Sequence, residues 1–177
     1  MMNLIQKFIS KDRSNKSALR TNFSHYFFSL PEHQWITTST TKTHFEELFS
    51  RLPAGVLDAM MTKYPVSFVQ SQSMKNPAHK NMFGNSIVVF PEFQKLIAGS
   101  KRSAVAYLAH ELAFVLYELE SAKIDPLMAE VEADKFVCDL GLMFELEEFL
   151  LMLDETIEKR LRLTYLTVNH FCGDNEN

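Results

Sequence analysis

Two pairs of ionisable residues stand in apolar surroundings in the second half of the chain. His110 and Glu111 interrupt residues 104–117, in which every other residue is apolar or aromatic. Such a run predicts a helix that is buried all round, where an unpaired charge is costly. Further along, Glu130 and Asp134 lie four residues apart, which places two like charges on one helix face. Because this acidic pair needs a cation or a histidine against it, we expect the His110–Glu111 pair to face it from a neighbouring helix.

These residues resemble the active-site helices of the gluzincins, the group of zinc metallopeptidases that includes thermolysin. In that group one helix carries His-Glu-x-x-His and a following helix carries Glu-x-x-x-Asp. The matching segments here are His110-Glu111 and Glu130-Val-Glu-Ala-Asp134. The resemblance implies a zincin-like domain in which His110 and Glu130 are zinc ligands. It also implies that Glu111 acts on the attacking water as a general base and that Asp134 orients a histidine.

The chain departs from this pattern at position 114, where the second zinc histidine is replaced by Phe114. A catalytic zinc normally has three protein ligands plus water, and the motif here supplies only His110 and Glu130. Residues outside the motif that could act as a third ligand are His79, His170 and Cys172. The departure indicates weakly bound zinc or none, and a non-catalytic pseudo-peptidase that acts by binding a protein or peptide partner. An active zinc-dependent peptidase with an unusual third ligand is the alternative.

The helices that must position these residues are predicted from apolar periodicity and end signals. Residues 103–120 and 143–165 have helical spacing, and Asp125-Pro126 with Gly141 bounds a helix between them. Two earlier helices are predicted, one from a capping box at residues 43–46 to about Arg51, the other over about 53–63.

Strands are predicted over residues 65–70 and 86–90, with a further short strand over 34–38 and a loop over 71–84. The predicted class is α+β, a helix-rich zincin-like domain with a small β-sheet. A zincin requires the 86–90 strand to run past the 103–120 helix, whereas a plain helical interaction module, our third interpretation, does not. By resemblance, this strand would be the edge that meets a substrate or partner, through Ile87, Val88 and Val89.

Length and composition indicate one domain with a real core, since 46% of the 177 residues are hydrophobic. We expect a basic N-terminal segment over residues 1–22, with a polar connector from residue 10. The domain then covers residues 23–168, and a flexible tail covers 169–177. The aromatic residues of 23–28 are expected in the core.

Charge and motifs exclude several classes of function. The formal net charge is −4, and residues 111–158 carry fourteen acids against two lysines, which argues against nucleic-acid binding. There is no Gly-rich phosphate loop and no Gly-x-Ser-x-Gly motif. No apolar run reaches the roughly 18 residues of a transmembrane segment. Two cysteines are too few for a disulfide framework, so we expect a cytoplasmic protein.

Overall fold

The protein is built mainly from helices, with one small sheet. The computed structural model describes residues 16–71, 80–81, 84–99, 101–120 and 125–173. Within these ranges the helices are α2 (Lys16–Ser29), the 3₁₀ helix η1 (Pro31–His33), α3 (Ser39–Arg51), α4 (Ala54–Thr62), α5 (Pro91–Ala98), α6 (Ser103–Glu120), α7 (Pro126–Asp139), α8 (Met143–Met152) and α9 (Ile157–Gly173). The strands are β1 (Val66–Gln70), β2 (Lys80–Asn81) and β3 (Gly84–Val89). The predicted class, helix-rich α+β, is confirmed.

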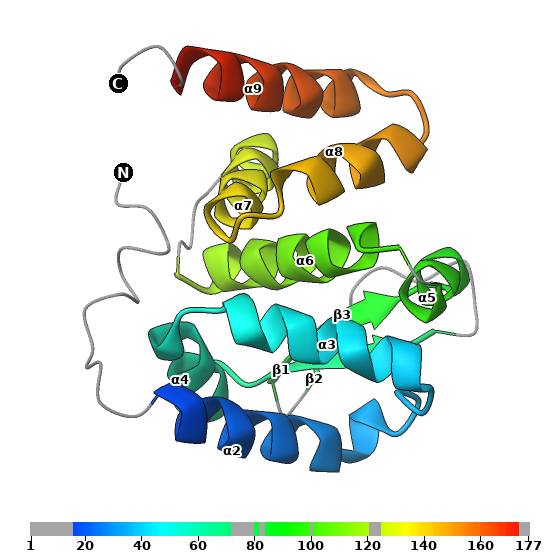
Figure 1. Cartoon of the computed structure of the whole chain (residues 1–177), viewed down its shortest axis with the longest axis vertical. Coiled ribbons are helices and arrows are strands. Elements are labelled where there is room, and N and C mark those ends of the chain that lie inside the picture. Colours follow the sequence, from blue (N-terminus) through cyan, green and yellow to red (C-terminus); the bar gives the residue numbers. More distant parts are fainter. Residues whose placement is uncertain (1–15, 72–79, 82–83, 100, 121–124, 174–177) are drawn as a thin grey trace.

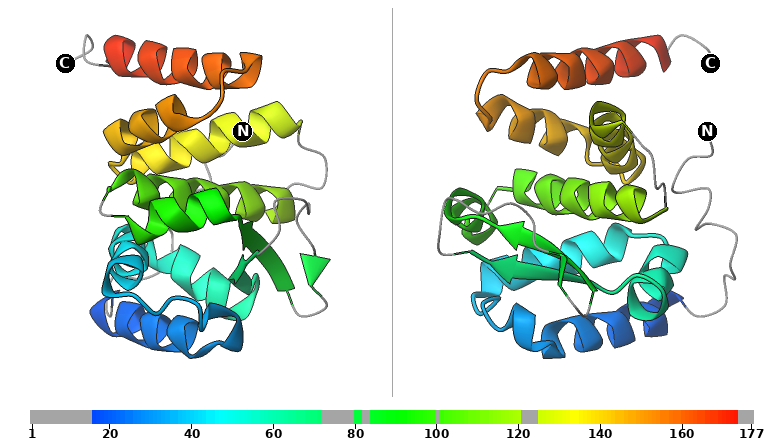
Figure 2. Two further views of the ribbon diagram at one scale, coloured as in Figure 1. Left: turned by 90° about the vertical axis from the view of Figure 1, so that its right-hand side faces the viewer. Right: turned by 180° about the vertical axis from the view of Figure 1, so that it is seen from behind.

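Helix α6 lies in the middle of a layered arrangement (Figure 1). On one side it packs against α7 and α8, and on the other against α3, α5 and β3. Helix α9 contacts α7 and α8 and forms an outer layer, at the end of the molecule opposite α2 (Figure 2). The apolar sequence of α6 is explained by this position, because almost every side chain from Ser103 to Ala113 is buried.

The sheet has the order β1-β3-β2 over the described residues. Strand β3 pairs in parallel with β1, from Val66 opposite Asn85 to Gln70 opposite Val89. Strand β2 is antiparallel to β3 and pairs with it only at Gly84 and Asn85. Both main strands were predicted, and β3 contacts α6 as a zincin-like arrangement requires. In this order β3 is the middle strand, not the edge strand that the resemblance implied. The Ile87 and Val89 side chains are buried in the core, and of the three residues expected to meet a partner only Val88 is half-buried.

The predicted ends of α6 and α7 are confirmed. Helix α6 covers Ser103–Glu120, and the Asp125 carboxylate caps α7 by accepting the Leu127 and Met128 N–H groups at 3.0 and 3.2 Å. Gly141 follows α7 with φ of 73°, the left-handed conformation that favours glycine. These local signals fix where the His110 and Glu130 helices begin and end.

The single helix predicted over residues 143–165 is wrong, because the chain breaks it into α8 and α9. The Thr156 hydroxyl starts α9 by accepting the Lys159 N–H at 3.1 Å. The Lys159 ammonium then bonds to the free carbonyls of Leu151 and Leu153 at the end of α8, at 3.4 and 2.7 Å. The break turns α9 back across α7.

Three N-terminal predictions also need correction. The short strand over 34–38 does not form: the His33 ring accepts the Phe68 N–H and the Trp35 indole donates to the Phe68 carbonyl, both at 2.9 Å. Side chains therefore occupy the β1 edge that such a strand would need. Helix α3 begins at Ser39, not at residue 43, because the Thr38 hydroxyl accepts the Thr41 N–H at 3.2 Å. The predicted polar connector is wrong for residues 16–22, which belong to α2.

Helices also run past the predicted tail boundary, since α9 continues to Gly173. The first fifteen residues lie outside the described ranges. The core prediction for the aromatic stretch is confirmed at Phe23 and Phe27, each 1% exposed.

Among the described helices, none combines the length and apolar character needed to cross a membrane.

Candidate functional site

Three of the four residues singled out on the two central helices, His110, Glu130 and Asp134, meet in one buried cluster. His110 Nδ1 lies 2.9 Å from Asp134 Oδ1, and His110 Nε2 lies 3.0 Å from Glu130 Oε2. His110 is 3% exposed and Asp134 is fully buried, whereas Glu130 is partly exposed. The predicted convergence of His110 with both carboxylates is therefore confirmed, although the roles that the resemblance assigns to them stay predictions.

Small side chains allow the two helices to approach each other at this point. Ala109 and Ala113 on α6 and Ala129 and Ala133 on α7 are all buried, within the extensive packing between these helices. Ala113 follows His110 by three residues and Ala133 follows Glu130 by three residues, so small side chains lie beside the longer polar ones that span the interface. The local sequence thus builds the contact as well as supplying the charges.

The cluster contains a fourth member that sequence reasoning missed, Arg162 on α9. Its guanidinium grips Asp134 with two bonds, from Nε to Oδ2 and from Nη2 to Oδ1, both 2.7 Å long. Arg162 Nη1 lies 2.9 Å from Glu130 Oε2, and Nη2 lies 3.2 Å from His110 Nδ1. One guanidinium therefore contacts all three of the other side chains, and it ties the outer helix to α6 and α7.

A signal for Arg162 was present in the sequence. Lys159, Arg162, Leu163 and Leu166 share one face of α9, and all four are buried or half-buried. A basic residue on the apolar face of a helix needs an acidic partner inside the protein. Glu130 and Asp134 on α7 are the acidic partners of Arg162. Arg162 reaches them only because α8 ends at Met152 and α9 begins as a separate helix.

The charges in the cluster balance. Burial lowers the pKa of His110, but the contacts with Asp134 and Glu130 outweigh it and raise that pKa to about 9. Burial raises the pKa of Asp134, but hydrogen bonds from His110 and Arg162 outweigh this effect and hold it below its usual value. The pKa of Glu130 is also lowered, since His110 and Arg162 outweigh its burial. Two cations thus face two carboxylates at neutral pH, which explains how the core tolerates them.

The pairing of Glu130 is the weakest in this cluster. Its Oε2 lies within ion-pair distance of both cations but forms no well-directed hydrogen bond with either. We therefore attribute its lowered pKa to the two nearby positive charges, and we regard Asp134 as the better anchored carboxylate.

Glu111 differs from Glu130 and Asp134 because it joins no ion pair among the described residues. It is partly buried, and burial raises its pKa, helped by the charge of Glu130 and opposed by His110 and Arg162. Raised pKa values are typical of carboxyl groups that take part in proton transfer. Its role as a general base stays a prediction.

The residues present do not fit a tightly held zinc ion in this arrangement. Two donors on a tetrahedral zinc at about 2.1 Å stand about 3.4 Å apart, whereas His110 Nε2 and Glu130 Oε2 are in direct contact at 3.0 Å. The Arg162 guanidinium also lies against both ligand atoms, with Nη2 3.4 Å from His110 Nε2 and Nη1 2.9 Å from Glu130 Oε2. Phe114, half-buried against the core, offers no lone pair. Among the described residues, no three His, Cys, Asp or Glu side chains are placed to hold a metal. His79 and the side chains of His170 and Cys172 lie outside the described part.

No protein-family model, curated protein or solved structure matches this chain. The resemblance to the gluzincins therefore depends on the motif residues of α6 and α7. It stays an interpretation.

Proposed function

We propose that this chain is a non-catalytic, metallopeptidase-like domain that acts by binding a protein or peptide partner. The observation that supports this proposal best is the position of Arg162, whose guanidinium contacts His110, Glu130 and Asp134 together. A positive charge held by the residues that would bind and support a zinc ion makes the cluster stable without metal. In this interpretation the cluster holds α6, α7 and α9 together and does not catalyse peptide hydrolysis.

A guanidinium replaces the charge of a metal ion but not its reactivity. Catalytic zinc keeps an open position for water and lowers the pKa of that water to about 7. Arginine stays protonated and has no coordination site, so it cannot activate a nucleophile. Glu111 would then have no activated water to act upon. These arguments favour the pseudo-peptidase over the alternative, an active peptidase with a third ligand from residues that the structure does not describe.

Binding is supported by exposed apolar side chains around the end of α8. Leu151 is 61% exposed and Ile157 is 79% exposed, and Met152 beside them is 46% exposed. Neighbouring exposed apolar residues are typical of surfaces that bind other proteins. A cytoplasmic location and the absence of nucleic-acid binding are parts of the same proposal, supported by the free Cys138 thiol and by the acidic charge of residues 111–158.

Metal analysis tests this proposal directly. Protein purified without added zinc should contain far less than one zinc per chain, and its melting temperature should not change when EDTA is added. Cleavage of a mixed fluorogenic peptide library should equal that of a heat-inactivated sample.

His110→Ala and His25→Ala form a matched pair, because His25 is an exposed histidine on α2. Any weak effect of added zinc should be the same in both variants. Stoichiometric zinc that is lost in His110→Ala but kept in His25→Ala would refute the proposal and establish a live metal site.

A further inference from the structure

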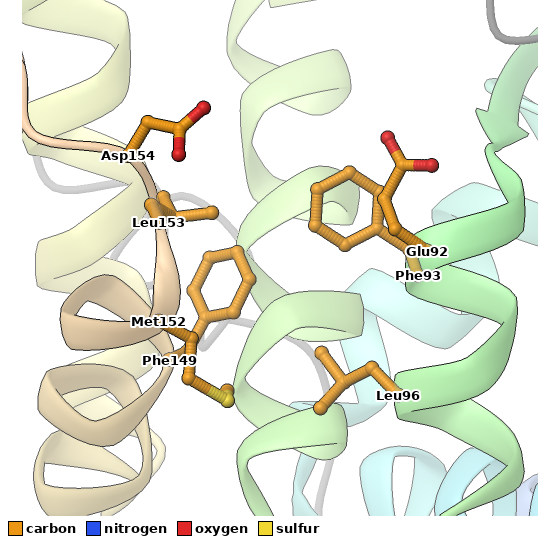
Figure 3. Close-up of a pocket in the computed structure, with 7 residues that line it drawn as sticks. All are labelled: Glu92, Phe93, Leu96, Phe149, Met152, Leu153 and Asp154. Atoms are coloured by element: carbon orange, nitrogen blue, oxygen red, sulfur yellow. The ribbon is translucent and has the colours of Figure 1, made fainter.

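A pocket of about 370 Å³ lies between α5 and α8, away from the His110 cluster. Its floor is apolar and includes the rings of Phe93 and Phe149, which pack against each other at a tilt with their centroids 6.2 Å apart (Figure 3). The volume is in the range of pockets that hold small ligands or single side chains. The Phe93 ring is held in place by stacking on Tyr107 at 4.5 Å, so this wall is preformed.

The pocket has a polar end made only of acids. The carboxylates of Glu92 and Asp154 lie at the same end on opposite walls, while Leu96 and Met152 lie at the other end (Figure 3). Glu92 and Asp154 are the only charged side chains among the described residues that line the pocket.

Two acids on α8 have cationic partners. Glu148 pairs with Lys101 at 3.0 Å, and Glu145 pairs with Arg102 at 3.1 Å. By contrast, neither Glu92 nor Asp154 forms an ion pair or a side-chain hydrogen bond within the described residues. Glu92 and Asp154 are therefore two unpaired acids that lie on opposite walls of the apolar pocket.

We propose that this pocket binds an arginine or lysine side chain presented by a protein partner next to an apolar residue. The cationic group would lie between Glu92 and Asp154, and its apolar stem would lie on the two phenylalanine rings, which also attract a cation through their faces. The exposed Met152, which lines the pocket, would cover the neighbouring apolar residue. This inference deepens the partner-binding part of the proposed function and rests on it.

The test uses the full chain with labelled methionine methyl groups and two peptide probes. One probe is Ac-Ala-Leu-Arg-Leu-Ala-NH₂, and the other replaces its arginine with citrulline, which has nearly the same shape without the charge. We expect the arginine peptide to shift the Met152 methyl resonance, assigned with a Met152→Leu variant. The citrulline peptide should bind at least about tenfold more weakly, because it loses the charge complementarity.

The double variant Glu92→Gln, Asp154→Asn should weaken arginine-peptide binding by about tenfold with an unchanged melting temperature, since both side chains are exposed. The matched control is Glu118→Gln, Glu147→Gln, which removes the same charge from exposed positions outside the pocket and should bind as the native chain does.

Several results would overturn the proposal. These are no shift of the Met152 resonance by the arginine peptide, equal binding of both peptides, or an equal loss in the control variant. Binding of free arginine amide as tightly as the peptide would mean a site for small cations and not for a protein. The experiment is independent of the metal test: a chain that bound zinc at His110 would refute the pseudo-peptidase, whatever the pocket binds.

Discussion

Replacing Arg162 by methionine should destabilise the protein severely, and the structure indicates by how much. Methionine keeps an unbranched apolar stem against α7, so the main loss is the guanidinium. Asp134, which is fully buried, would lose both of its bonds to Arg162 and keep only His110 at 2.9 Å. Breaking a buried ion pair from one side costs about 3–5 kcal/mol of unfolding free energy. Because protonated His110 still compensates part of the Asp134 charge, we expect the unfolding free energy to fall by about 3 kcal/mol.

Urea unfolding followed by circular dichroism at pH 7 measures this loss. The matched control is Arg160→Met, two residues earlier on α9, whose side chain is 72% exposed and pairs with Glu155 at the surface. That variant should unfold at nearly the native urea concentration. The difference between native protein and Arg162→Met should also shrink below about pH 4, because the lowered pKa of Asp134 stabilises the fold only while its carboxylate is ionised. Equal losses in the two variants would show that the Arg162 contacts carry no stability, and our account of the cluster would be wrong.

Three further predictions concern the same cluster. Glu130→Ala should lower the unfolding free energy by roughly 2–4 kcal/mol, since it leaves two buried cations with one carboxylate, whereas Glu147→Ala on the exposed face of α8 should have little effect in the same thermal melt. The pKa of His110 is raised from 6.5 to about 9, so its contribution is complete below pH 6.5 and is lost as the pH rises through 9; urea unfolding of His110→Gln should lack this decline, and a parallel decline in both proteins would contradict the assignment. Zinc should raise the melting temperature of a Phe114→His, Arg162→Leu double variant more than that of Phe114→His alone, because the guanidinium must leave before a metal can enter; equal shifts would mean that Arg162 does not compete with the ion.

Local signals in the sequence predicted much of the fold around the cluster. Asp125-Pro126 and Gly141 bound α7 because a cap and a left-handed residue depend only on near neighbours. The alternating and β-branched residues of 65–70 and 86–90 gave both main strands. The pairing of His110 with two acids was also predictable, since buried charges must be compensated and few residues were available.

The errors arose where side chains from distant segments decide the outcome. The 34–38 segment has a strand-like composition, yet His33 and Trp35 bond to the Phe68 backbone and use the β1 edge that it needed. The break after α8 depends on the Thr156 hydroxyl, one threonine inside an otherwise periodic run. Since that break was not predicted, Arg162 lay in the last turn of the predicted 143–165 helix, and the sequence did not identify the cation of the cluster.

The position of Arg162 late in the chain has a consequence for the order of events during synthesis. Residues 110–134 emerge from the ribosome before it, since Arg162 follows Asp134 by 28 residues and His110 by 52. During synthesis the N-terminal part of a chain is available for contacts before the C-terminal part. A nascent chain ending at α8 could pair its helices, but it would hold two carboxylates against one histidinium, a net negative charge in its interior. Docking of α9 then supplies the missing positive charge through Arg162. The interior of the protein therefore becomes electrically neutral only when α9 is in place.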